Sequence, residues 1–248
     1  MSQAATGRLY RVPLHRLRVL GLRVRGLWVL ASLCAFAGAA LAHDVSAANA
    51  RYVAALDGPA PVPFLYLGAK HMVTGLDHVF FLIGVVFFIR RLKDILLYVS
   101  LFTVGHSLTL LGGVFYGVSL NHAAVDAVIG VSVLYKAFEN MGGFDRLFGR
   151  RFDMRAMVFG FGLVHGLGLS GKLQDLSLSD NGLLVNLVSF NLGVEIGQVI
   201  VLTAVIGLLD AWRRLPGFSA QAFAANTALM AGGVVLTGLH LFGLLVTP

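Results

Sequence analysis

Histidine and carboxylate side chains occur inside long apolar stretches of this sequence, where ionisable groups are costly. The stretch that follows residue 65 holds His71, Asp77 and His78. In one continuous helix His71 and His78 would share a face, about 10 Å apart along the axis, and Asp77 would border that face. Imidazoles and carboxylates are the usual protein ligands of divalent transition metals where thiolates are lacking. The segment therefore predicts a metal site.

Later apolar stretches carry more residues of the same kind. The predicted metal ligands are His71, Asp77, His78, His106, His165 and Glu195, and the secondary candidates are His43, Asp126, Asn191 and His240. For His240 a hydrogen bond between helices is the preferred interpretation, and for His106 and Asn191 that role and a ligand role both stay open. Asp126 could instead cap a helix.

Glycines lie beside several of these polar residues, as at Gly105 and Gly166. Gly193 and Gly197 form a G-x-x-x-G pattern, which permits two helices to approach closely. We expect such contacts to bring ligands from different helices within reach of one another.

The composition places these residues in a membrane. Of 248 residues, 57% are hydrophobic and 12% are charged, about half the charged share of a soluble domain. Six of the nineteen basic residues lie in the first 26 positions, so the net charge of +7 belongs to a leader and a nucleic-acid partner is not expected. The one cysteine, Cys34, excludes an internal disulfide and a site built on several thiolates.

The order of segments predicts an all-α, polytopic membrane helix bundle. Residues 1–42 have a basic start, an apolar centre and an Ala-Leu-Ala end, which is typical of a cleavable signal peptide; an uncleaved anchor is the alternative. Residues 43–65 would be an extracytoplasmic segment that begins with His43, and 66–248 the membrane domain. Six apolar stretches are each long enough to cross a bilayer. They are 66–89, 94–117, 123–140, 155–173, 182–209 and 224–246.

The charges of the loops predict the orientation. Basic residues gather after the first, third and fifth stretches, for example Arg90, Arg150 and Arg213. These loops would be cytoplasmic, with both ends of the mature chain outside the bacterial inner membrane. The candidate ligands would then lie in the outer half or near the midplane. We expect almost no polar groups in the inner half, and hence no polar path across it.

Four motifs in this order resemble the HupE/UreJ family of bacterial membrane proteins, and within it the second, divergent branch. They are Gly68-x-x-His71-x5-Asp77-His78, Phe102-Thr103-x-x-His106-Ser107-x-Thr109, Val164-His165-Gly166-Leu167-Gly168 and Phe190-Asn191-x-Gly193-x-Glu195-x-Gly197-Gln198. The better-known branch places two His and a Glu in one motif, Phe-His-Gly-x-x-His-Gly-x-Glu, whereas here His165 and Glu195 belong to different stretches.

The resemblance implies a secondary permease that supplies nickel or cobalt. The expected partners are membrane lipid and a divalent transition metal ion (Ni, Co or Zn). It also implies that His71, Asp77 and His78 recognise the metal, with His165 and Glu195 contributing further. The alternative from the residues is an intramembrane metal-dependent hydrolase or a metallocentre-assembly protein that uses the same site, with Glu195 as general base. A homo-oligomer or an assembly partner is compatible with either.

Overall fold

The computed structural model describes residues 52–53, 56–150, 152–175 and 179–246. Within these ranges the chain forms eight α-helices and no strand, which confirms the predicted all-α class. The predicted signal peptide and His43 lie outside the described residues, so both stay predictions.

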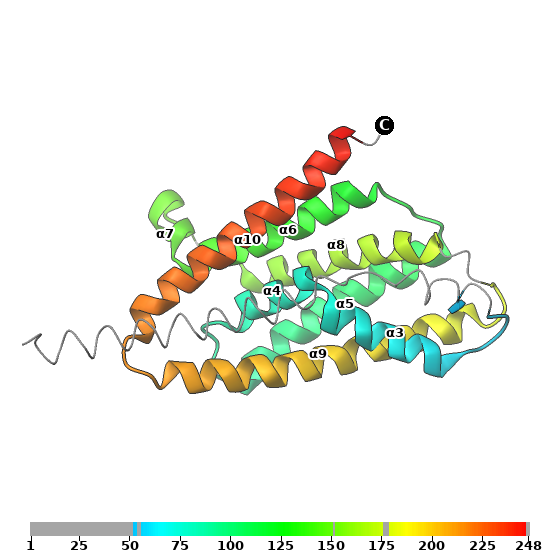
Figure 1. Ribbon diagram of the computed structural model, residues 1–248, viewed down its shortest axis with the longest axis horizontal. Coiled ribbons are helices and arrows are strands. Elements are labelled where there is room, and N and C mark those ends of the chain that lie inside the picture. Colours follow the sequence, from blue (N-terminus) through cyan, green and yellow to red (C-terminus); the bar gives the residue numbers. More distant parts are fainter. Residues whose placement is uncertain (1–51, 54–55, 151, 176–178, 247–248) are drawn as a thin grey trace, which may run out of the picture.

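The helices follow the predicted apolar stretches closely (Figure 1). In chain order they are α3 (Pro61–Thr74), α4 (Leu76–Val86), α5 (Leu92–Phe115), α6 (His122–Asn140), α7 (Gly143–Phe148), α8 (Met154–Gln174), α9 (Leu183–Arg213) and α10 (Phe218–Val246). Helices α3 and α10 begin five and six residues before the predicted stretches, and two further features differ from expectation. The first stretch forms two helices instead of one, and the short α7 lies in a predicted loop.

Local sequence explains several helix ends. Pro61 begins α3 at a first-turn position, where proline is favoured because its missing N–H would have no partner inside the helix. The side chains of Asn121 and Asp153 cap α6 and α8 by accepting from the backbone N–H groups of Ala124 and Arg155.

Three pairs of helices pack closely: α3 with α9, α5 with α8, and α6 with α10. Glycines make each approach possible. A Cβ atom at Gly193 would overlap the Leu65 carbonyl, one at Gly162 the Phe102 carbonyl, and one at Gly130 the backbone of Thr237. The predicted role of small residues in helix approach is confirmed for Gly193.

The short helix α4 lies inside the bundle and contacts α3, α6, α9 and α10. Its core side chains are almost fully buried, with Phe81 and Leu82 each 1% exposed. Large apolar side chains on the outer helices are instead exposed, for example Val199 on α9 and Leu239 on α10. Such exposed apolar side chains suit a lipid environment.

Four described helices are long and apolar enough to cross a membrane: α5, α8, α9 and α10. The bent pair α3–α4 would be a fifth span. Helix α6 does not meet the same criterion because it carries Asp126, Lys136 and Glu139. The chain is therefore a multi-pass membrane protein by length and composition, and the sixth span stays a prediction.

Candidate metal centre

The bundle contains a sharp break at Gly75, where α3 and α4 meet at 65°. The Gly75 N–H donates to the His71 carbonyl at 2.8 Å, and the Gly75 carbonyl accepts from the Val79 N–H at 3.0 Å. A Cβ atom on Gly75 would come within 2.9 Å of both the His71 carbonyl and the His78 ring. This position therefore needs glycine.

The break brings His71 and His78 together. A straight helix would separate them by about 10 Å along its axis, whereas their ring centroids are 4.8 Å apart. The expectation of one continuous helix was wrong here. The corrected geometry draws the two imidazoles closer, as a shared site requires.

A third imidazole completes the cluster. One ring nitrogen each from His71, His78 and His106 can be chosen so that all three lie within 4.8 Å of one another, and the residues come from α3, α4 and α5. Two ligands on opposite sides of a transition metal are about 4.2 Å apart, so small side-chain movements would let all three bind one ion.

The chemistry of these nitrogens also fits a metal. His78 and His106 are only 3% and 1% exposed. Among the described residues, Nε2 of His71, Nε2 of His78 and both ring nitrogens of His106 are buried without a hydrogen-bond partner. Buried polar atoms without partners are unfavourable, and a cation would give them one.

Neighbouring groups orient the rings. Nδ1 of His78 lies 2.9 Å from Asp77 Oδ1, which also accepts from the His78 backbone N–H. If Nδ1–H donates to Asp77, the lone pair of Nε2 is free to bind a metal. A carboxylate in this position also makes the imidazole a stronger ligand.

His165 approaches the cluster from α8. Its ring centroid is 4.9 Å from that of His78, and its Nδ1 lies 2.7 Å from the Phe161 carbonyl. Nε2 of His165 is another buried nitrogen without a partner among the described residues. His78 is thus adjacent to all three other imidazoles, and His165 is a candidate fourth ligand.

Polar side chains join α5 to α9 beside the cluster. The Thr103 hydroxyl donates to Gln198 Oε1 at 2.7 Å, and the Ser107 hydroxyl donates to Asn191 Oδ1 at 3.2 Å. The amide NH₂ groups of Asn191 and Gln198 have no partner within the described part of the chain. Asn191 therefore acts as a contact between helices in this structure, one of the two roles predicted for it.

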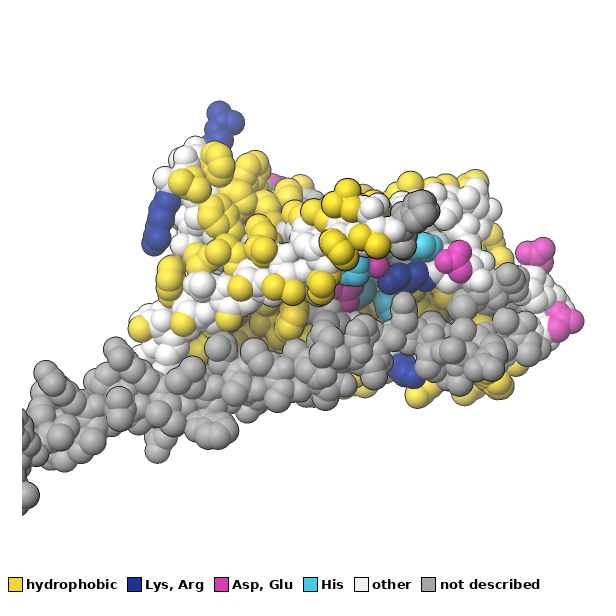
Figure 2. All heavy atoms as spheres, turned by 45° about the horizontal axis from the view of Figure 1, so that its top comes forward, with side chains coloured by type: hydrophobic (Ala, Val, Ile, Leu, Met, Phe, Trp, Pro, Cys, Tyr) yellow, Lys and Arg dark blue, Asp and Glu magenta, His cyan; other side chains and the backbone are white. Residues whose placement is uncertain are grey.

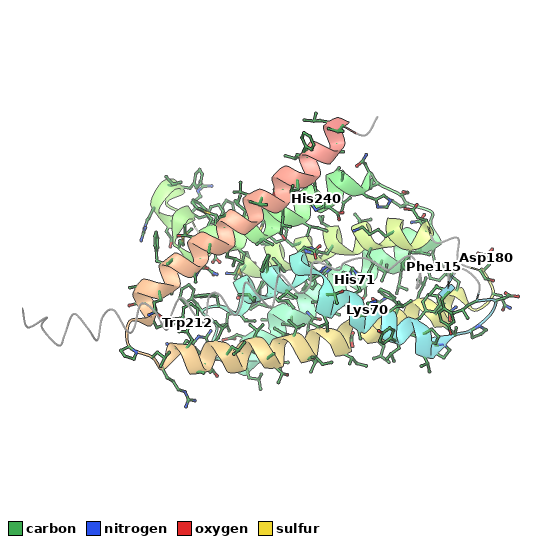
Figure 3. All side chains as sticks on the ribbon, viewed as in Figure 1. Lys70, His71, Phe115, Asp180, Trp212 and His240 are labelled. Carbon is green, nitrogen blue, oxygen red and sulfur yellow. The ribbon has the colours of Figure 1, made fainter. Side chains whose placement is uncertain are left out.

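Asp126 and His240 lie outside the cluster. The Asp126 carboxylate forms an ion pair with the Lys172 ammonium at 3.3 Å, and Nδ1 of His240 lies 3.9 Å from the same carboxylate oxygen. Figure 3 shows His240 on α10, away from His71 on α3. The preferred interpretation of His240, a contact between helices, agrees with this position.

Glu195 is also separate from the four imidazoles. Its side chain is exposed on α9, and the group of close potential ligands found among the described residues does not include it. Its assignment as a ligand stays a prediction, and in this conformation it does not serve the cluster.

The cluster is mostly buried, since His78, His106 and His165 are at most 3% exposed. The face drawn in Figure 2 carries a region where His, acidic and basic side chains gather, bordered by hydrophobic side chains. His71 is partly exposed, unlike His78 and His106. An ion could therefore enter past His71.

A second polar network lies at the end of α6. Lys136 on α6 is 3% exposed, and its ammonium donates to Glu139 and to Asn140 Oδ1. Nδ2 of Asn140 donates to Oδ1 of Asn226 on α10 at 2.9 Å. Which side of the membrane this network faces depends on the predicted orientation, so the expectation of almost no polar groups in the inner half stays a prediction. The spacing of Lys136, Glu139 and Asn140, three and four residues apart in an apolar stretch, was the signal in the sequence.

Comparison with known proteins agrees with the motifs. A family model described as HupE / UreJ protein matches residues 47–247. The chain belongs to the HupE/UreJ family. This family is associated with nickel or cobalt transport or with metallocentre assembly. Neither the curated proteins nor the solved structures gave a match.

Proposed function

We propose that this HupE/UreJ protein is a secondary permease for a divalent transition metal, nickel or cobalt. The observation that carries the proposal is the group of His71, His78 and His106 at the 65° break between α3 and α4, which together would make one broken span. Broken helices are a recurrent feature of transporters, because unwound backbone and half-helix ends line ion sites near the middle of the membrane.

The donor set favours these metals. Imidazole nitrogens suit Ni²⁺, Co²⁺ and Zn²⁺, whereas Mg²⁺ and Ca²⁺ prefer oxygen ligands. His78 would be the central ligand, oriented by Asp77, with His71 at the entrance and His106 behind it. His165 would bind as the ion moves deeper.

Transport should be measured in proteoliposomes with radiolabelled Ni²⁺ and Co²⁺. We expect uptake above that of empty vesicles, and a loss of at least about tenfold in His78→Ala because the central ligand is removed. Asp210→Asn is a suitable control, since its exposed carboxylate pairs with Arg213 and lies outside the cluster. Equal uptake by wild type and empty vesicles for every divalent metal would refute transport.

Metallocentre assembly is the second candidate, and the partly exposed His71 favours it. Three imidazoles with one accessible position can release a metal to an acceptor as readily as pass it through a membrane. Stoichiometric metal that never enters vesicles, but moves to an acceptor chelator in a His78-dependent way, would support this reading over transport.

A further inference from the structure

The three most buried imidazoles of the cluster differ in how their rings are held. Nδ1 of His78 lies 2.9 Å from Asp77 Oδ1. Nδ1 of His165 lies 2.7 Å from the Phe161 carbonyl. His106 is only 1% exposed, but neither of its ring nitrogens has a partner among the described residues. Because a metal-bound imidazole almost always donates its other ring N–H to an oxygen or a water, His106 lacks an acceptor.

Two hydrogen bonds between α5 and α9 lie on either side of His106 along α5. Thr103, three residues before His106, donates to Gln198 Oε1 at 2.7 Å. Ser107, the residue after His106, donates to Asn191 Oδ1 at 3.2 Å. Residues three apart on a helix are neighbours on its surface. Both amides therefore contact α5 within one helical turn of His106, and the NH₂ group of each is buried without a partner in the described part of the chain.

The Thr103 hydroxyl has more acceptors than hydrogens. It lies 3.0 Å from the Val99 carbonyl and 2.7 Å from Gln198 Oε1, but a hydroxyl donates only one hydrogen. A carbonyl cannot donate in return, whereas an amide can. Turned over about its last bond, the Gln198 amide donates from its NH₂ group to Thr103, and the Thr103 hydroxyl donates to Val99. The Gln198 oxygen then takes the buried position in which the NH₂ group has no partner.

The amide of Asn191 does not offer the same exchange. Its Oδ1 accepts from the Ser107 hydroxyl, which has no second acceptor among the described residues. Turning this amide over would leave the partly buried hydroxyl without an acceptor, which is unfavourable. Gln198 is thus the amide that can supply a free oxygen beside His106, while Asn191 keeps its contact with α5.

We infer that the Gln198 amide adopts the turned orientation and accepts the ring N–H of His106. The contact corresponds to the one that Asp77 makes with His78. It provides partners for the His106 N–H, the Gln198 oxygen and the Thr103 hydroxyl together. The other ring nitrogen of His106 is left with its lone pair free for the metal. Gln198 is therefore a positioning residue for His106.

This hydrogen bond does not require a metal. A neutral imidazole always carries one N–H, so the buried ring of His106 needs an acceptor whether or not an ion is bound. A Gln198 oxygen that bound the metal directly would leave this N–H without a partner. The effect of Gln198 on metal binding rests on the proposed function, whereas the hydrogen bond itself does not.

Co²⁺ binding to purified full-length protein tests the inference through a double-mutant cycle. Gln198→Leu removes the acceptor and should weaken Co²⁺ binding by about 10–100-fold. In a His106→Ala background the same substitution should change the affinity by less than about twofold, because the ring that Gln198 holds is gone. Gln198→Glu keeps an acceptor oxygen but no NH₂ group, so it should bind Co²⁺ at least as tightly as wild type.

Gln174→Leu is the matched control. The NH₂ group of Gln174 donates to the carbonyls of Gly113 and Val118, nine residues beyond His165 along α8, so this variant should keep wild-type affinity. An equal loss from Gln198→Leu in both backgrounds would overturn the inference, because it would indicate a packing defect or a direct bond to the metal. Wild-type affinity in Gln198→Leu would overturn it as well.

Thermal unfolding of metal-free protein tests the hydrogen bond by itself. Gln198→Leu and His106→Ala each break the contact, so the double variant should lose less melting temperature than the sum of the two single losses. Additive losses would refute the hydrogen bond. If wild type binds no Co²⁺, the proposed function fails, while this second cycle still decides whether Gln198 holds His106.

Discussion

The carboxylate of Asp77 should strengthen metal binding without itself binding the metal. It accepts two hydrogen bonds from His78, one from the ring Nδ1 and one from the backbone N–H, both at 2.9 Å. The first fixes which ring nitrogen carries the proton and leaves Nε2 free. Partners of this kind typically change metal affinity by about 10–100-fold, or about 1.4–2.7 kcal/mol.

Two substitutions separate the charge from the hydrogen bond. Asp77→Asn keeps an oxygen that can accept from His78 but removes the charge, so we expect Co²⁺ affinity to fall about tenfold. Asp77→Leu removes both, leaves the ring free to turn, and should weaken binding by up to about 100-fold. Equilibrium dialysis of Co²⁺ with purified protein measures both, and Asp210→Asn serves as the control at a surface carboxylate.

The visible spectrum of bound Co²⁺ provides a second readout. If Asp77 acts through His78, Asp77→Asn should keep the wild-type spectrum at saturation, because the ligands are unchanged. If Asp77 is itself a ligand, the spectrum should change. Wild-type affinity in Asp77→Leu would refute the reasoning altogether.

Two other outcomes follow from the packing and from the cluster. Gly193→Ala should destabilise the protein by about 1–3 kcal/mol, because its Cβ atom would overlap the Leu65 carbonyl. Gly207→Ala, where no atom lies within 4 Å of the added Cβ atom, is the control and should be neutral or stabilising. Thermal unfolding in detergent compares the two variants, and equal melting temperatures would argue against the α3–α9 contact. Ni²⁺ at 100 times its Kd should add about 2.7 kcal/mol to the free energy of unfolding, and a chelator should remove that gain. The His78→Ala variant should show no such gain. A Ni²⁺-dependent shift that survives in His78→Ala would place the metal elsewhere.

The sequence by itself determined the helical membrane class, the helix positions and most of the cluster. Apolar stretches and their breaks are local properties, so the ends of α5, α6 and α8 fall within two residues of the predicted ones. His71, Asp77, His78, His106 and His165 were identified as candidates because ionisable groups in apolar stretches are costly wherever the chain folds. The family motifs pointed to the same residues; the family match confirmed the family itself, and the roles of the residues stay predictions.

Only the tertiary structure decided which of these residues meet. The break at Gly75 leaves no room for a Cβ atom beside the His71 carbonyl and the His78 ring, a constraint that helical periodicity does not describe. Glu195 is exposed because it lies on the face of α9 opposite to Gly193 and Gly197, the two glycines that pack against α3. The hydrogen-bond network of Lys136, Glu139 and Asn140 was not predicted, because it forms only where α6 packs against α4 and α10. Spacing along one helix predicts a shared face, but the packing of several helices decides whether that face meets a metal, another helix or lipid.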